Sequence, residues 1–180
     1  MMALFFWIIA ASAALLIQPR LAIFDYPLNL TVIVVYAYGI NKAVQHSAAQ
    51  GFSDISAELK STLFGAAIGF IEDSMTGAFI GPNVLSKGMT GLVSSFVFRE
   101  IFFSWDSVLG GIVLCCLTIF DDLLSLGMRL IFSDLIIGGR AVAELIVMQA
   151  VMNIPFGLLV KPAHKDAPQE HEWFRRRRYN

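Results

Sequence analysis

The sequence has few charged residues, and this shortage excludes an ordinary soluble fold. Only 15% of its 180 residues are Asp, Glu, Lys or Arg, whereas 57% are hydrophobic and the mean hydropathy is +0.69. Soluble domains carry about 25% charged residues. The apolar residues lie in long blocks without the alternation of apolar and polar positions that a transmembrane barrel requires. We therefore expect a chain whose solvent is lipid and whose spanning segments are helices.

Residues that carry common catalytic chemistry are also scarce. Cys115 and Cys116 are adjacent within an apolar block, where neither a disulfide nor a metal site fits. His46, His164 and His171 lie in polar segments without the spacing of metal ligands, and the glycine-rich loop that binds nucleotide phosphates is missing. We expect no enzymatic activity, no cofactor and no metal site. The net charge of −1 gives no reason to expect a nucleic-acid partner.

Six apolar blocks separated by short polar segments are present instead. They predict an all-α integral membrane protein with a six-span domain at residues 1–160 and a basic cytoplasmic tail at residues 161–180. The first block lacks the positive residues that begin a signal peptide, so we take it as an uncleaved span. The predicted spans cover residues 3–17, 28–40, 59–80, 84–103, 108–120 and 141–160.

Two of these spans have uncertain limits. The second begins at Leu21 instead of Leu28 if Asp25-Tyr26-Pro27 forms a kink. The fifth ends at Phe120 and, at ~1.5 Å per residue, is shorter than a hydrocarbon core of ~30 Å. It is therefore half a span, or Asp121 and Asp122 lie at the edge of the bilayer.

The distribution of Lys and Arg predicts the orientation, because cytoplasmic loops carry the excess. Six spans place both termini on one side. That side carries nine basic residues: Lys42, Lys60, Arg99, Lys161, Lys165, Arg175, Arg176, Arg177 and Arg178. The other side carries four: Arg20, Lys87, Arg129 and Arg140. Both termini are therefore expected in the cytoplasm. The four arginines of the tail either bind anionic membrane lipid or only anchor this topology.

The pair Glu72-Asp73 lies within the third predicted span, where a carboxylate costs about 2.5–3.5 kcal/mol. Asp73 belongs to a four-residue series whose small members let another helix approach closely, namely Gly65, Gly69, Gly77 and Gly81. We therefore expect Asp73 in a tight seam between helices, and Glu72 on another face.

The partner of Asp73 is left open by the sequence. Lys87, Asn83 and backbone donors freed at Gly81-Pro82 are the candidates. Asp73 is either a proton or ion relay, a polar contact for a partner helix, or a structural clasp inside the bundle, and we favour the clasp.

Residues from Pro27 to about Val93 resemble the rod shape-determining protein MreD family. Pro27-Leu28-Asn29-Leu30 opens the second span, and Gly69-Phe70-Ile71-Glu72-Asp73 is similar to the Gly-Phe-x-x-Asp centre of that family. A glycine-rich entry to the fourth span follows at residues 81–91. Where the family often has Gln before the Asp, this chain has Glu72, and its basic tail is longer than usual.

The resemblance implies a non-enzymatic scaffold in the bacterial inner membrane. Such a protein binds MreC and acts near MreB, RodA and a class-B penicillin-binding protein in cell elongation and peptidoglycan synthesis. We expect the glycine and Asp73 face to form the internal core, leaving another helix surface for MreC.

The resemblance also implies a six-helix bundle similar to the S component of energy-coupling-factor transporters. This fold supplies an alternative function, that of a substrate-binding component for uptake of a small molecule such as a vitamin. Ala10 and Ala14 provide the Ala-x-x-x-Ala face that such components carry on their first span.

Overall fold

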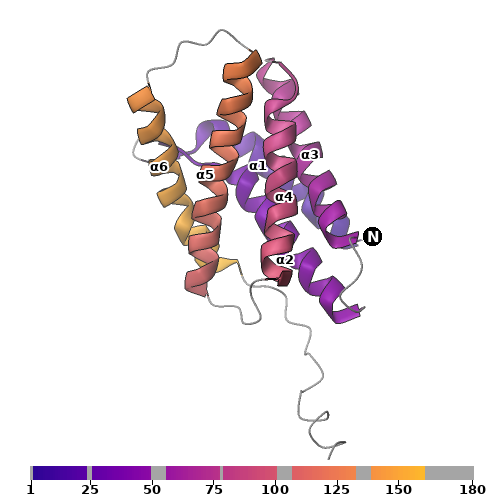
Figure 1. Ribbon diagram of the computed structural model, residues 1–180. Coiled ribbons are helices and arrows are strands. Elements are labelled where there is room, and N and C mark those ends of the chain that lie inside the picture. Colours follow the sequence, from indigo (N-terminus) through magenta and orange to yellow (C-terminus); the bar gives the residue numbers. More distant parts are fainter. Residues whose placement is uncertain are drawn as a thin grey trace, which may run out of the picture.

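The computed structural model describes residues 2–23, 26–49, 56–77, 79–100, 107–132 and 139–160. These residues form six helices and one short antiparallel hairpin (Figure 1), so the all-α prediction is confirmed for this part of the chain. The elements are α1 (Met2–Ile17), one turn of 3₁₀ helix η1 (Gln18–Arg20), β1 (Ala22–Ile23), β2 (Tyr26–Pro27), α2 (Leu30–Ala49), α3 (Ser56–Thr76), α4 (Pro82–Glu100), α5 (Ser107–Phe132) and α6 (Gly139–Leu159).

Helix α2 is the centre of the bundle and contacts every other helix. Val32, Tyr36 and Ile40 are buried against α5, and Val35 is buried in a second cluster with residues of α1 and α3. The hydroxyl of Tyr36 donates a hydrogen bond of 3.0 Å to the carbonyl of Gly110 at the start of α5. Among the described side chains of α2, none of the large apolar ones is exposed, so this helix is covered all round.

Helices α3 and α4 form a seam in which backbone lies against backbone. A Cβ atom added at Gly65 would overlap the carbonyl of Lys87, one at Gly69 the carbonyl of Asn83, and one at Gly91 the carbonyl of Ser61. Glycine at these positions is what permits so close an approach, since any larger residue would push the two helices apart.

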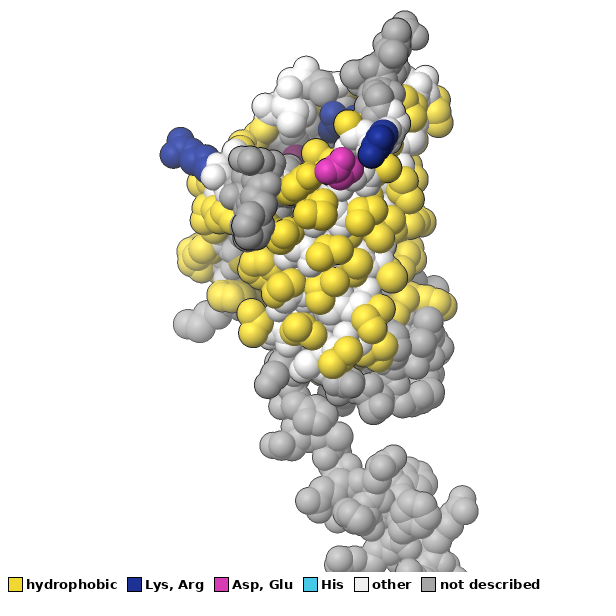
Figure 2. Space-filling model, turned by 90° about the vertical axis from the view of Figure 1, so that its left-hand side faces the viewer, with side chains coloured by type: hydrophobic (Ala, Val, Ile, Leu, Met, Phe, Trp, Pro, Cys, Tyr) yellow, Lys and Arg dark blue, Asp and Glu magenta, His cyan; other side chains and the backbone are white. Residues whose placement is uncertain are grey.

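Charged and hydroxyl-bearing residues are buried beside the apolar core, while many large apolar residues are exposed. Asp73, Lys87 and Asp121 are buried, together with serines and threonines of α2, α3, α4 and α5. Large apolar side chains are exposed on α1, α3, α4, α5 and α6. Figure 2 shows one such face, where hydrophobic side chains form a broad surface and the visible charged ones gather near one end. Two helices, α5 and α6, are long and apolar enough to cross a membrane by length and composition.

Two predicted limits are wrong. Helix α5 continues through Asp121 and Asp122 to Phe132, so the fifth segment does not end at Phe120 and is longer than half a span. The position of Asp121 and Asp122 at the edge of the bilayer stays a prediction. Helix α2 continues to Ala49, well past the predicted end at Ile40. Of the two starts considered for the second span, Leu28 agrees with the structure to within two residues, because α2 begins at Leu30. The start at Leu21 does not, because strands β1 and β2 precede α2.

The remaining predicted spans agree with the helices to within a few residues. The third span, for example, was predicted to end at residue 80, and α3 ends at Thr76. Residues 161–180, with Arg175, Arg176, Arg177 and Arg178, lie outside the described residues. The structure therefore leaves the predicted roles of the basic tail as predictions.

Candidate functional site

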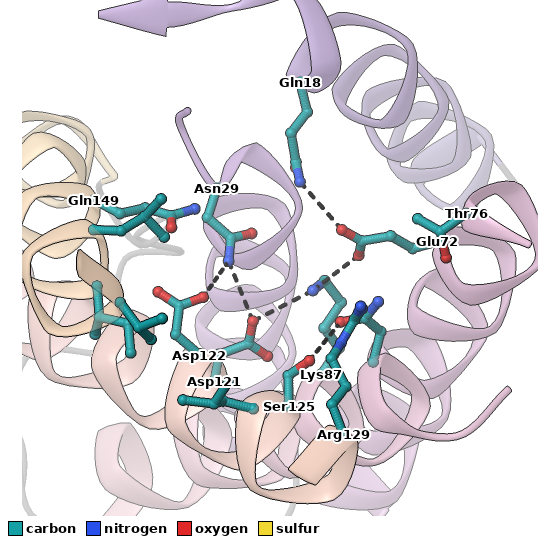
Figure 3. A pocket seen from close by; sticks show the side chains of 15 residues that line it. Gln18, Asn29, Glu72, Thr76, Lys87, Asp121, Asp122, Ser125, Arg129 and Gln149 are labelled. Carbon is teal, nitrogen blue, oxygen red and sulfur yellow. Dashed lines mark hydrogen bonds and ion pairs between the residues drawn. The ribbon is translucent and has the colours of Figure 1, made fainter. Parts of the chain in front are cut away.

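A polar cavity of about 260 Å³ opens at the end of the bundle where α1 ends and α2 begins. The polar side chains of Gln18, Asn29, Glu72, Lys87 and Asp122 line it (Figure 3). They come from η1, the residue before α2, α3, α4 and α5, and α6 closes one side with Gln149 and three apolar residues. Segments far apart in the sequence therefore meet around one hollow.

Lys87 of α4 is the buried cation of this site and is only 1% exposed. Its Nζ lies 2.8 Å from Oε2 of Glu72 and 3.3 Å from Oδ2 of Asp121. The hydroxyl of Thr90 also lies within hydrogen-bond distance of Asp121, at 3.4 Å. Because an unpaired ammonium is costly away from water, these carboxylates are what allow Lys87 to be buried. The pairing ties α3, α4 and α5 together through side chains.

Asn29 and Gln18 connect this charge cluster to the N-terminus of α2. Asn29 donates hydrogen bonds to Asp121 (3.2 Å) and Asp122 (3.3 Å), and its carbonyl oxygen accepts one from the backbone N–H of Val32 (3.3 Å). Gln18 donates to Glu72 (3.1 Å) and accepts from the backbone N–H of Thr31 (3.0 Å). Both amides thus cap α2 while they orient the carboxylates of the cavity.

Asp73 lies beside the cavity without facing Lys87. Its carboxylate accepts hydrogen bonds from the backbone N–H groups of Gly81 (2.9 Å), Asn83 (3.2 Å) and Val84 (3.3 Å). These groups are free donors at the N-terminus of α4, where a negative charge is also favourable. Of the partners that the sequence left open, Asp73 therefore uses the backbone donors, and the Lys87 ammonium pairs with Glu72 instead.

The other predicted site residues separate into two groups. Gly65 and Gly69 lie in the seam between α3 and α4. Gly77 and Gly81 lie beyond the end of α3 and have positive φ angles of 63° and 147°. The four-residue series therefore does not continue along one helix face, because Gly77 ends the helix in the left-handed conformation that favours glycine.

Asn83 lines the cavity, and its side-chain oxygen accepts a hydrogen bond of 3.1 Å from the hydroxyl of Ser125. Glu72, Asp121 and Asp122 also line it, yet they were not among the residues predicted to form a site. A signal for them was present, because charges of opposite sign inside apolar helices are expected to pair with one another. Sequence spacing could not show which charges would meet.

Asp122 and Gln149 have polar groups that the protein leaves unmatched. Oδ1 of Asp122 accepts from Asn29, whereas Oδ2 is buried without a hydrogen-bond partner in the described part of the chain. Gln149 of α6 is 7% exposed and lines the cavity, and its amide makes no hydrogen bond with a described residue. In Figure 3 both lie toward the α6 side, away from Glu72 and Lys87.

The arrangement can bind and orient a small polar molecule. Three carboxylates and the cations Lys87 and Arg129 line the cavity, so its charged groups number one more acid than base. Within the described residues, His, Cys, Asp and Glu side chains do not gather in a group of three that could hold a metal ion.

Comparison of the chain with protein-family models, with curated proteins and with solved structures found no match.

Proposed function

We propose that the protein is a six-span inner-membrane scaffold of the bacterial cell-elongation machinery, of the MreD type, that acts by binding MreC. The observation that supports this proposal most is where the MreD-like residues lie. Asn29 caps α2 and holds two carboxylates, Gly65 and Gly69 form the seam, and Asp73 caps α4. A motif spread over residues 27–93 thus builds the interior of one bundle, which leaves the outer helix faces for a partner.

A position within the membrane is supported by the exposed apolar surface. Only 33% and 28% of the most apolar stretches of α5 and α6 are buried, unlike the core helix of a soluble protein. Soluble monomers rarely expose contiguous apolar patches of more than a few hundred Å². Lipid around the bundle accounts for these faces and for the buried serines, threonines and charges.

The orientation with both termini in the cytoplasm gains support from Lys87. This lysine is buried in the charge cluster and does not lie in a loop. The number of basic loop residues on the side opposite the termini therefore falls from four to three, against nine on the side of the termini. In this orientation the cavity opens on the outer side of the membrane.

Crosslinking in membranes tests the scaffold proposal. A photoreactive amino acid is placed, one position at a time, at exposed apolar sites on different helices: Leu63, Phe96, Ile112 and Val151. A matched control is placed at Val35, which is buried in the centre. We expect one helix face to capture MreC, a single-span membrane protein, while the control captures nothing. Capture of lipid alone at every position would contradict the proposal.

One specific observation favours a second candidate function, that of a substrate-binding component of an uptake system. The polar cavity at the outer end of the bundle provides a pocket that a scaffold does not need. Uptake of a small molecule that depends on both this chain and a partner ATPase would support this candidate.

A further inference from the structure

From the unmatched groups of the cavity we infer that it binds a small organic ammonium ion, held by Asp122 and Gln149. This inference goes beyond the scaffold proposal. It deepens the second candidate function, on whose ligand-binding cavity it rests, by naming the class of ligand.

The charge of the ligand follows from the pairing within the cavity. The ammonium of Lys87 lies between Glu72 and Asp121, which are 2.8 and 3.3 Å away. Among the described residues, the donor to Asp122 is a neutral amide, that of Asn29. With all three lining carboxylates ionised beside two cations, one added positive charge balances the site. A monovalent cation therefore fits, whereas an anion would add to the negative charge already there.

The hydrogen-bonding groups of the ligand follow from Asp122 and Gln149. Oδ2 of Asp122 needs a donor, and the side-chain torsion of aspartate is broad enough for this oxygen to turn toward the cavity. Gln149 lines the cavity, and its side-chain carbonyl oxygen can accept from a second N–H of the same ligand. An ammonium group with several N–H bonds can donate to both, which a bare metal ion cannot do.

The size of the ligand follows from the volume. A cavity of about 260 Å³ lies just under the range of about 300–1,000 Å³ that is usual for small-molecule sites. Leu145, Ile146 and Val142 of α6 supply an apolar wall beside the polar groups. The ligand class is therefore a primary or secondary ammonium on a short apolar body.

Thermal unfolding of the full chain in detergent tests this inference, with n-butylammonium as the probe. A second sample receives tetramethylammonium, which has the same charge without N–H donors, and a third receives butyrate, all at equal ionic strength. We expect butylammonium alone to raise Tm, by roughly 4–7 °C at about 20 times its Kd. If butylammonium does not raise Tm, or if tetramethylammonium raises it equally, the inference is overturned. This result needs only the unmodified chain.

Two variants locate the bound ion. Asp122→Asn keeps the shape of the side chain and removes its charge, and Gln149→Leu removes the amide. Glu144→Gln is the matched control, since it removes one charge from an exposed carboxylate that bonds Tyr26 outside the cavity. We expect the control to keep the butylammonium response, Asp122→Asn to lose it and Gln149→Leu to weaken it. A full response in Asp122→Asn would overturn the inference. The crosslinking experiment is independent of this result, so the scaffold proposal and the ammonium site can fail separately.

Discussion

At the scale of single residues, Lys87 decides how the charged interior is balanced. It is buried between Glu72 and Asp121, so each of these carboxylates depends on it for compensation. Replacement of Lys87 by Met should lower the free energy of unfolding by about 3–5 kcal/mol, the usual cost of leaving buried partners unpaired. Thermal unfolding in detergent measures this loss.

The matched control for Lys87 is Lys60→Met, which changes an exposed lysine on α3. We expect it to alter stability by no more than about 0.5 kcal/mol. Equal losses for the two variants would show that Lys87 is not held by its carboxylates.

Asp73 accepts from three backbone N–H groups at the start of α4, which is the geometry of a structural clasp. An Asn side chain can still accept hydrogen bonds from some of these N–H groups. Asp73→Asn should therefore lower the free energy of unfolding by about 1 kcal/mol, and Asp73→Ala by up to about 2 kcal/mol. Chemical or thermal unfolding of both variants checks this order. If the scaffold proposal holds, rod-shaped cells should persist with Asp73→Asn, and loss of rod shape at a normal membrane level of this variant would contradict a purely structural role.

At the scale of elements, the seam between α3 and α4 depends on the absence of side chains. A Cβ at Gly69 would overlap the backbone of Asn83, and backbone cannot move aside as a flexible side chain can. Gly69→Ala should therefore destabilise the bundle by roughly 1–3 kcal/mol, as overpacking does. The unfolding temperature in detergent measures the change.

Gly127 in α5 provides the comparison for Gly69, because a Cβ added there meets no described atom within 4 Å. Gly127→Ala should be neutral or should stabilise the protein by up to about 1 kcal/mol, since alanine favours the helix. If both glycines tolerate alanine equally, α3 and α4 do not pack as closely as described.

The position of the helices was largely predictable from the apolar blocks, while their limits were not. The fifth block was cut at Phe120 because Asp121 and Asp122 look like the end of a span. Asn29, Thr90 and Lys87 lie against Asp121 in the fold, and these contacts let the helix pass through it. Such partners come from other helices, so their effect on a helix limit is invisible in a local sequence pattern.

The candidate site was predictable in part, for a similar reason. Gly65 and Gly69 are four residues apart on one helix, and this spacing is visible in the sequence. The pairing of Glu72 with Lys87 and the capping role of Asn29 depend on how α2, α3 and α4 are placed around the cavity. The sequence showed that Asp73 needed partners, and only the fold showed that they are backbone N–H groups.

At the scale of the whole molecule, the six-span proposal makes a prediction about the two ends of the bundle. In a chain with Cys115 and Cys116 replaced by alanine, single cysteines are introduced at Ile80, between α3 and α4, and at Lys60, near the start of α3. Both positions are exposed. A membrane-impermeant maleimide should label Ile80→Cys in intact cells and Lys60→Cys only after the membrane is permeabilised. Equal labelling of both cysteines in intact cells would rule out this topology.

The proposal of a membrane bundle rests on the distribution of the described residues, in which charges and hydroxyls are buried and many large apolar side chains are exposed, as lipid would favour. The most direct measurement of this claim is a wash of native membranes with alkaline carbonate, followed by determination of where the chain is found. We predict that it stays in the membrane pellet and is released by detergent alone. A chain that leaves the membrane with the carbonate and remains folded in plain buffer would contradict the account.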